Sequence, residues 1–268
     1  MSTPEPLPEI DRPLGAERDL VPVSPASIGG APVAYVVALS GVVAAFSFIP
    51  FSIALSAGSS FPMAQGIYAL CGLILGPWAG GVASGAGALV GVLLAPHTAG
   101  LPWLTVGGAF LGAVFAGSLV GGRRRRPLRV AVGTLLAAEA VLFWQHAIGH
   151  NGVHPALFLE AYAAHGLAFA LFLLPTRIAI ERLILSPNLK RVALGLFLAT
   201  WTATGMMMFT ESFLGYYLLN WPEPVFRIFI GIIPAEQAAR SGIGAVVGTG
   251  VIAGLRAMAV LRPRGAAY

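Results

Sequence analysis

Eight ionisable side chains lie within long apolar stretches of this sequence, where a charge is costly to bury. They are Glu139, His146, His150, Glu160, His165, Glu211, Glu236 and Arg240. Inside a membrane a charged group costs at least about 2.5–3.5 kcal/mol, so such groups are normally paired or functional. Carboxylates, imidazoles and a guanidinium can together hydrogen-bond a small polar solute. We therefore predict that these eight residues, with Trp144 and Gln145, are candidates for solute binding.

The histidine spacing leaves three interpretations open. Glu139, His146 and His150 are separated by seven and four residues, so they share one face of a helix. His146, His150 and His154 have the spacing HxxxHxxxH, which is similar to a metal-ligand pattern, although Pro155 predicts that the helix ends before His154. The three interpretations are a metal site at these histidines, a pocket for an organic ligand, and histidines that only pack and hydrogen-bond.

Two further pairs of alternatives concern the same candidates. Glu236 and Arg240 are four residues apart, so they can form a local ion pair instead of binding a solute. Trp144 can stack on a small molecule, or it can anchor a helix end at the membrane interface.

The composition identifies the environment in which these groups are buried. The 268 residues are 57% hydrophobic and only 10% charged, and the mean hydropathy is +0.81. Soluble domains carry about 25% charged residues, so this chain cannot cover a globular surface in water. Cys71 is the only cysteine, which excludes a disulfide within the chain and a cysteine-based zinc site. The sequence therefore predicts an integral membrane protein.

Apolar segments of sufficient length for a bilayer, roughly 20 residues each, occur eight times. They span residues 31–55, 61–78, 80–94, 102–121, 128–149, 155–178, 192–219 and 228–255. The second and third are separated only by GPWAG, so they form either a tight hairpin or a re-entrant loop, and a count of six or seven stays open. We predict an all-α bundle of about eight transmembrane helices over residues 31–258. Residues 1–30 and 259–268 are predicted to be polar cytoplasmic tails, the first of them disordered.

The basic residues predict an orientation in the cell membrane. They cluster at residues 123–129, 177–191 and 256–264, whereas the intervening loops carry only Arg227. Cytoplasmic loops are enriched in Lys and Arg, so both termini are predicted to be cytoplasmic. The run Arg123–Arg126 is then a membrane-surface anchor, and we expect no nucleic-acid partner. In this topology the eight ionisable groups lie toward the outer side.

The motifs of common enzymes are missing. The sequence contains no GxxxxGK[ST] loop, and its only lysine, Lys190, follows Leu189 instead of a glycine. GxSxG and HExxH motifs are missing as well. We therefore expect that the protein is not an enzyme, and that any uphill transport uses an ion gradient or another subunit.

Residues 61–100, FPMAQGIYALCGLILGPWAGGVASGAGALVGVLLAPHTAG, resemble the second-to-third helix region of the substrate-binding (S) components of energy-coupling factor transporters. The residues that match the "GPxxG" turn of that family are Gly76, Pro77, Trp78 and Gly80. The resemblance implies an all-helical protein that binds a vitamin or metal ion in its outer half. It also implies docking on a transmembrane coupling protein with two cytoplasmic ATPases.

Small residues in the first predicted helix resemble the docking face of that family. They are Ser40, Gly41, Ala44 and Ala45. Glycines four residues apart also occur at 81 and 85, 87 and 91, 108 and 112, 244 and 248, and 250 and 254, and they indicate close helix packing within the bundle or against a partner.

Three functions remain compatible with the sequence. The first is a solute-binding subunit for uptake. The second is a gradient-driven transporter that uses Glu139, Glu211 and the histidines as a proton relay. The third is an accessory or assembly subunit whose polar groups only pack.

Overall fold

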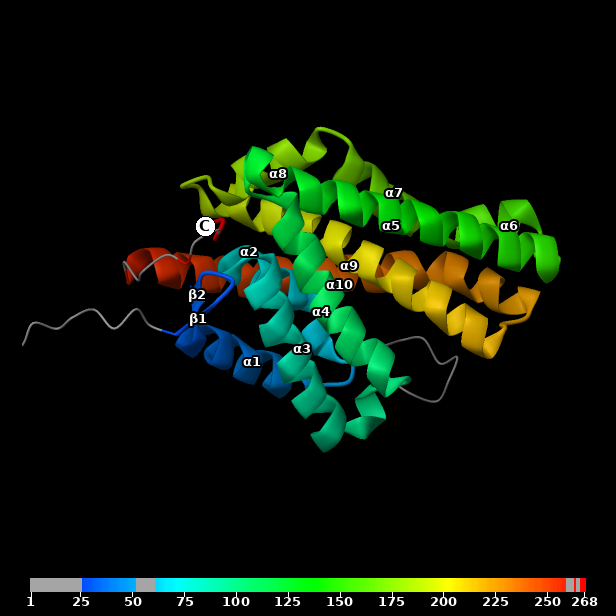
Figure 1. Cartoon of the computed structure of the whole chain (residues 1–268), viewed down its shortest axis with the longest axis horizontal. Coiled ribbons are helices and arrows are strands. Elements are labelled where there is room, and N and C mark those ends of the chain that lie inside the picture. Colours follow the sequence, from blue (N-terminus) through cyan, green and yellow to red (C-terminus); the bar gives the residue numbers. More distant parts are fainter. Residues whose placement is uncertain (1–25, 52–60, 259–262, 264–265) are drawn as a thin grey trace, which may run out of the picture.

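The computed structural model describes residues 26–51, 61–258, 263 and 266–268, and within them the fold is helical apart from one short β-ribbon (Figure 1). The ribbon pairs β1 (Ser27–Ile28) with β2 (Ala31–Pro32) in antiparallel register. The first half of the chain then forms α1 (Val33–Ser47), η1 (Met63–Gly66), α2 (Tyr68–Leu75), α3 (Pro77–Leu94), η2 (Pro96–Thr98) and α4 (Pro102–Leu119). The second half forms η3 (Gly122–Arg125), α5 (Arg126–Trp144), η4 (Gln145–His150), α6 (Pro155–Ala161), α7 (Ala163–Leu173), α8 (Thr176–Ile184), α9 (Leu189–Leu219) and α10 (Glu223–Ala257).

Five helices are long and apolar enough to cross a membrane. Four of them are α3, α4, α9 and α10. The fifth is the continuous helical stretch Gly122–His150, which contains α5. A sixth span results if α6 and α7, which meet at a bend of 64°, are one crossing. Large apolar side chains are exposed on the outside of these helices, among them Leu93 (71% exposed) and Val246 (77%). An apolar outer surface of this kind is typical of contact with lipid, and it indicates a helical membrane protein.

The prediction of eight spans of full length is not supported, because two segments are short. The segment 61–78 forms only the turn η1 and the eight-residue α2, which ends at Gly76 with φ +88°. That positive φ is readily adopted by glycine, and Pro77 then begins α3. The first segment, α1, has 15 residues. Hydropathy alone does not distinguish such short buried helices from complete spans.

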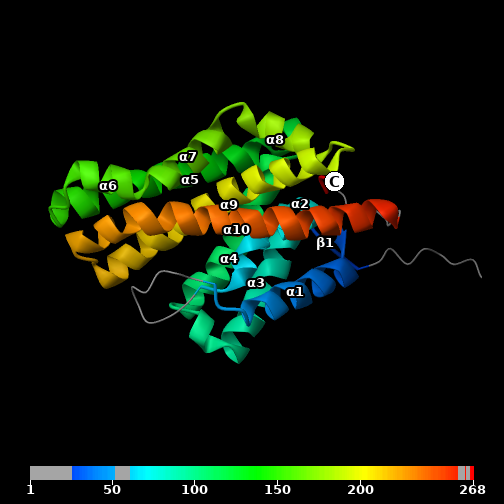
Figure 2. The ribbon, with the colours of Figure 1, turned by 180° about the vertical axis from the view of Figure 1, so that it is seen from behind.

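The long helix α9 is at the centre of the bundle. It packs against α10, α4, α7 and α8, and more weakly against α2 and α5. Figures 1 and 2 show α5, α9 and α10 running lengthwise, with α1 to α4 gathered on one side of them. The core therefore joins both halves of the chain around one helix.

Close glycine contacts set the distance between neighbouring helices. A Cβ at Gly87 of α3 would lie 2.5 Å from the Ser40 carbonyl oxygen and 2.6 Å from the Val43 Cβ of α1. Gly248 of α10 would come within 2.9 Å of Leu196 of α9, whereas Gly250 has no neighbouring atom within 4 Å. Most of the predicted small-residue faces therefore pack inside the bundle.

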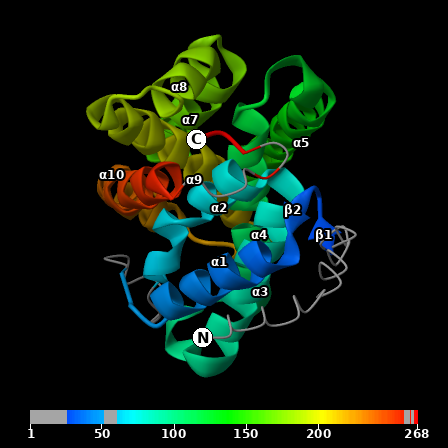
Figure 3. The ribbon, with the colours of Figure 1, turned by 90° about the vertical axis from the view of Figure 1, so that its left-hand side faces the viewer.

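The turn η3 with the start of α5, the helix α8, the start of α9 and the C-terminal part of α10 carry most of the described Lys and Arg residues, and they lie at one end of the molecule, which faces the viewer in Figure 3. The backbone N–H of Gly121 donates to Glu181 Oε1 of α8 at 2.8 Å. Arg256, near the end of α10, donates to the Ser186 carbonyl oxygen at 2.7 Å, and so joins α10 to the turn between α8 and α9. The β-ribbon lies at the same end, because Gly29 contacts Ala79 at the start of α3.

Candidate functional site

A buried ion pair on α10 is the most polar feature of the apolar bundle. Arg240 Nη2 donates to Glu236 Oε2 at 2.7 Å, and their side chains are only 2% and 4% exposed. Arg240 also lies over the ring of Phe61, with its Cζ 5.5 Å from the ring centroid, which is a cation–π contact. The helical spacing of four residues places both charges on the face of α10 that meets α9.

Beside this pair lies a cavity of about 80 Å³ between α7, α9 and α10. The cavity is lined by Phe61, His165, Met208, Ser212, Trp221, Phe229, Ile232, Ile233, Glu236 and Arg240. Three predicted residues, His165, Glu236 and Arg240, therefore meet at one place. A water molecule occupies about 30 Å³ of liquid, so the cavity has room for a few small non-hydrogen atoms.

Two side chains at this cavity have hydrogen-bonding atoms that no described residue satisfies. His165 is 2% exposed, and neither its Nδ1 nor its Nε2 has a partner within the described part of the chain. The same is true of Arg240 Nε. A buried polar group without a partner costs about 1–3 kcal/mol, so groups of this kind are uncommon in native proteins unless they have a role. Both residues line the cavity, where they can bind a polar ligand.

The polar residue next to Glu236 has a structural role. Gln237 Nε2 donates to the Trp201 carbonyl oxygen at 2.7 Å and to Thr204 Oγ1 at 2.6 Å, so it ties α10 to α9. These bonds fix the rotation of α10 and therefore the direction in which Glu236 and Arg240 point.

Glu211 of α9 contacts α4 and does not line the cavity, whereas Met208 and Ser212 of the same helix do. Its carboxylate fills the space above Gly108 of α4, where a Cβ would overlap Oε1. Glu211 is 9% exposed, and its Oε1 has no hydrogen-bond partner among the described residues. The carboxylate is within electrostatic reach of Arg240 but does not line the cavity.

Glu139 joins two helices at a third location. Thr210 Oγ1 of α9 donates to Glu139 Oε2 of α5 at 2.7 Å, and Glu139 is 6% exposed. One turn further along α5, Phe143 packs against Phe209 and Phe213 of α9. Glu139 therefore belongs to the interface between α5 and α9.

His146 and His150 lie in the π-helical turn η4, which follows α5 at the end opposite the basic residues. The ring of His146 stacks on Tyr217 with a centroid distance of 4.2 Å and on His150 at 5.4 Å. Asn151 Nδ2 donates to the Tyr216 hydroxyl at 2.6 Å. Such π-helical turns occur frequently at functional sites.

The remaining predicted site residues near this turn do not form a polar pocket with His146 and His150. Gln145, His154 and Glu160 are exposed, and Trp144 packs edge-on against Phe158 of α6 at 5.6 Å. Within the described residues, no three or more His, Cys, Asp or Glu side chains are grouped to hold a metal ion. The geometry thus gives no support to the predicted metal site.

The aromatic residues of the cavity could not be identified in the sequence. Phe61, Trp221 and Phe229 belong to a chain that is 10% aromatic, and nothing in their spacing separates them from core residues. Ser212 follows Glu211 directly, but only the rotation of α9 shows that the serine, and not the glutamate, lines the cavity.

The predicted docking face of α1 is partly open. Gly41 and Ala45 are exposed, and Gly41 has no neighbouring atom within 4 Å of the position that a Cβ would take. Ser40 and Ala44 are half-buried, and the Ser40 carbonyl contacts Gly87 of α3. At the predicted family-like turn, Trp78 is 55% exposed and Gly80 packs on the backbone of Cys71.

Searches for related proteins found no match to the chain among known protein families, curated proteins or solved structures.

Proposed function

We propose that this protein is a membrane-embedded solute-binding subunit for uptake, similar to the substrate-binding component of an energy-coupling factor transporter. The observation that carries the proposal is the pair of unsatisfied groups, the imidazole of His165 and Nε of Arg240, at one buried cavity. A solute that hydrogen-bonds both groups offsets the cost of burying them.

The lining of the cavity indicates the chemistry of the solute. Arg240 Nε supplies a donor, and His165 supplies a donor and an acceptor when it is neutral. The rings of Phe61, Trp221 and Phe229 form apolar walls. The solute is therefore a small polar molecule with at least one hydrogen-bond acceptor. The cavity of about 80 Å³ is smaller than the roughly 300–1,000 Å³ of pockets for drug-sized ligands, so a vitamin requires these side chains to move.

The orientation belongs to the same proposal. The basic end lies in the cytoplasm, because cytoplasmic loops of membrane proteins are enriched in Lys and Arg. The hydrogen bonds from Gly121 to Glu181 and from Arg256 to Ser186 support a single basic end. Eight helical segments lie in the plasma membrane, and two of them, α1 and α2, are too short to cross a bilayer of about 30 Å.

Energy for uptake comes from separate subunits. Because the sequence has no nucleotide-binding loop, ATP hydrolysis occurs on cytoplasmic ATPases attached through a transmembrane coupling protein. The open positions Gly41 and Ala45 on α1 leave room for a helix of that coupling protein.

One observation favours a second function, a gradient-driven transporter. Glu211 is buried with an unsatisfied Oε1, and buried carboxylates of this kind mark proton pathways in membrane transporters. Uptake by the purified protein alone, in liposomes with an imposed proton gradient, would favour this function over the first.

A thermal-shift screen of the purified protein in detergent tests solute binding. Water-soluble vitamins, amino acids and divalent cations are added one at a time, and we expect one class to raise the unfolding temperature. His165→Phe should abolish that rise, whereas His150→Phe, at an exposed position at the far end of α5, should retain it. A rise that persists in His165→Phe would place the solute outside this cavity. Co-purification of ATPases from the native membrane tests the coupling separately.

A further inference from the structure

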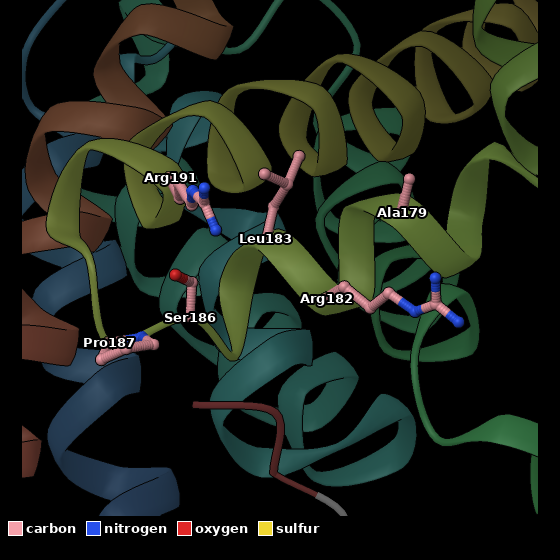
Figure 4. Close-up of a pocket in the computed structure, with 6 residues that line it drawn as sticks. All are labelled: Ala179, Arg182, Leu183, Ser186, Pro187 and Arg191. Atoms are coloured by element: carbon pink, nitrogen blue, oxygen red, sulfur yellow. The ribbon is translucent and has the colours of Figure 1, made fainter.

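A second hollow lies at the basic end, on the hairpin of α8 and α9, far along α9 from the polar cavity. It has a volume of about 500 Å³ and opens to the outside of the molecule. Its lining consists of Ala179, Arg182, Leu183, Ser186, Pro187 and Arg191 (Figure 4). Figure 4 shows Arg182 and Arg191 on either side of Leu183. The hollow therefore has an apolar floor with Arg191 beside it, and the Arg182 guanidinium is directed away from Arg191 (Figure 4).

One close contact within the hairpin and two hydrogen bonds from α10 hold it in place. A Cβ at Gly195 of α9 would lie 2.8 Å from the backbone nitrogen of Ile184, so the glycine lets α8 lie directly against α9. Arg256 of α10 donates to the carbonyl oxygens of Ser186 at 2.7 Å and Ile184 at 2.8 Å. These bonds satisfy carbonyl groups at the end of α8. These contacts fix the turn between α8 and α9, beside which Arg182 and Arg191 lie.

The charges at the hollow are not neutralised by described residues. Arg182 and Arg191 are exposed and form no ion pair within the described part of the chain. Glu181, the neighbouring acidic residue, accepts a hydrogen bond from the Gly121 backbone instead. The N-terminus of α9 also begins here, with the Asn188 side chain accepting from Lys190 N at 2.9 Å, and a helix N-terminus favours anions. The hollow is suited to an anion.

Exposed apolar residues surround the same hairpin. Ile178 is 43% exposed, Leu185 47% and Leu189 45%. The opposite face of α8, with Ile180 and Ile184, is buried in the bundle. An amphipathic helix with basic residues beside exposed apolar ones is typical of the membrane interface, where anionic lipids are attracted by Lys and Arg. A free anion would leave this apolar surface uncovered, whereas a phospholipid covers it with its acyl chains.

We propose that the hollow between α8 and α9 binds the headgroup of an anionic phospholipid, with the phosphate at Arg191 and the exposed Arg182 side chain turned toward it. The acyl chains then lie against Ile178, Leu185 and Leu189. This site does not depend on the proposed solute cavity, from which it differs in residues and in exposure.

Native mass spectrometry of the delipidated full-length protein in detergent tests this proposal, with phosphatidylglycerol and phosphatidylcholine as probes. We expect phosphatidylglycerol to bind more tightly. The double variant Arg182→Gln/Arg191→Gln should weaken that binding about tenfold or more, since each basic residue contributes about fivefold near an anionic surface. Arg182→Lys/Arg191→Lys, which keeps both charges, should retain most of the preference.

The matched control is Arg123→Gln/Arg124→Gln, which removes the same charge from exposed positions at the same end. We expect it to change the affinity less than the first double variant does, because detergent removes the anionic bilayer surface to which residues 123–126 are predicted to attach. An equal loss in both double variants would show diffuse charge attraction instead of a site, and equal binding of both lipids would exclude recognition of the anionic headgroup. Competition by glycerol phosphate at the same concentration as the lipid would show that the ligand is a free phosphate ester.

Discussion

Arg240 donates a hydrogen bond of 2.7 Å to Glu236, one turn earlier on α10, and both side chains are almost completely buried. The chain contains a second pair with the same spacing on the same helix, Arg227 and Glu223, whose side chains are 70% and 39% exposed. The two pairs differ in their surroundings but not in their local geometry. Comparing the two pairs separates the effect of burial on protein stability from the effect of the four-residue helical spacing.

Replacing Glu236 with Gln should strongly destabilise the protein. A buried ion pair that loses one partner leaves an uncompensated charge, which costs about 3–5 kcal/mol in proteins. The double variant Glu236→Gln/Arg240→Met should recover most of that loss, because no unpaired charge remains. Glu223→Gln should change the unfolding temperature in detergent only slightly, since exposed pairs contribute little. Equal effects of Glu223→Gln and Glu236→Gln would contradict the burial of the second pair.

Replacing Gly108 with Ala should also destabilise the bundle, because a Cβ there overlaps the Glu211 carboxylate. The adjacent Gly107 has no neighbouring atom within 4 Å, so Gly107→Ala should be neutral or stabilising by about 0.5–1 kcal/mol, the helical preference for Ala over Gly. Shortening the carboxylate side chain in Gly108→Ala/Glu211→Ser should relieve the overlap. Thermal unfolding of the wild type, Gly108→Ala, Glu211→Ser and the double variant gives the coupling energy, and additive effects would mean that the two side chains do not meet.

The sequence predicted the long helices well and the short ones poorly, for a physical reason. The predicted segments 102–121 and 192–219 correspond to α4 (102–119) and α9 (189–219), since an apolar run of about 20 residues is long enough for a membrane-length helix. The apolar run 61–78 does not form one, because Gly76 and Pro77 separate α2 from α3. The segment 155–178 is instead divided among α6, α7 and α8. Its bend follows Ala161, where neither proline nor glycine marks a break.

The candidate site was predicted by residue type but not by location. His165, Glu236 and Arg240 were recognised because charged or titratable groups are rare in this chain. Their separation from Glu139 and Glu211 depends on how each helix is rotated. In helices that are apolar on nearly all sides, the sequence does not define that rotation. The residues that line the cavity could therefore be identified only in the three-dimensional structure.

The open face of α1 leads to a prediction about coupling. Gly41→Leu should leave the unfolding temperature and solute affinity of the isolated protein nearly unchanged, because nothing lies within 4 Å of the new Cβ. The same change should abolish uptake and co-purification of a coupling protein, since a bulky residue holds a partner helix away. Gly87→Leu is the matched control, because its side chain collides with Ser40 and Val43 and should unfold the bundle itself. Normal uptake by Gly41→Leu would show that coupling, if it occurs, uses another surface.

The last prediction concerns orientation, on which the assignment of both ends depends. Single cysteines at exposed positions, Arg124→Cys at the basic end and His154→Cys before α6, can be introduced after replacing the buried Cys71 with Ala. Ser118, in the last turn of α4, is unsuitable because it is completely buried. Since Lys and Arg are enriched in cytoplasmic loops, an impermeant maleimide should label His154→Cys in intact cells and Arg124→Cys only after permeabilisation. Labelling of Arg124→Cys in intact cells would reverse the orientation. It would also place the α8–α9 hollow, and the anionic lipid that we assign to it, on the outer face of the membrane.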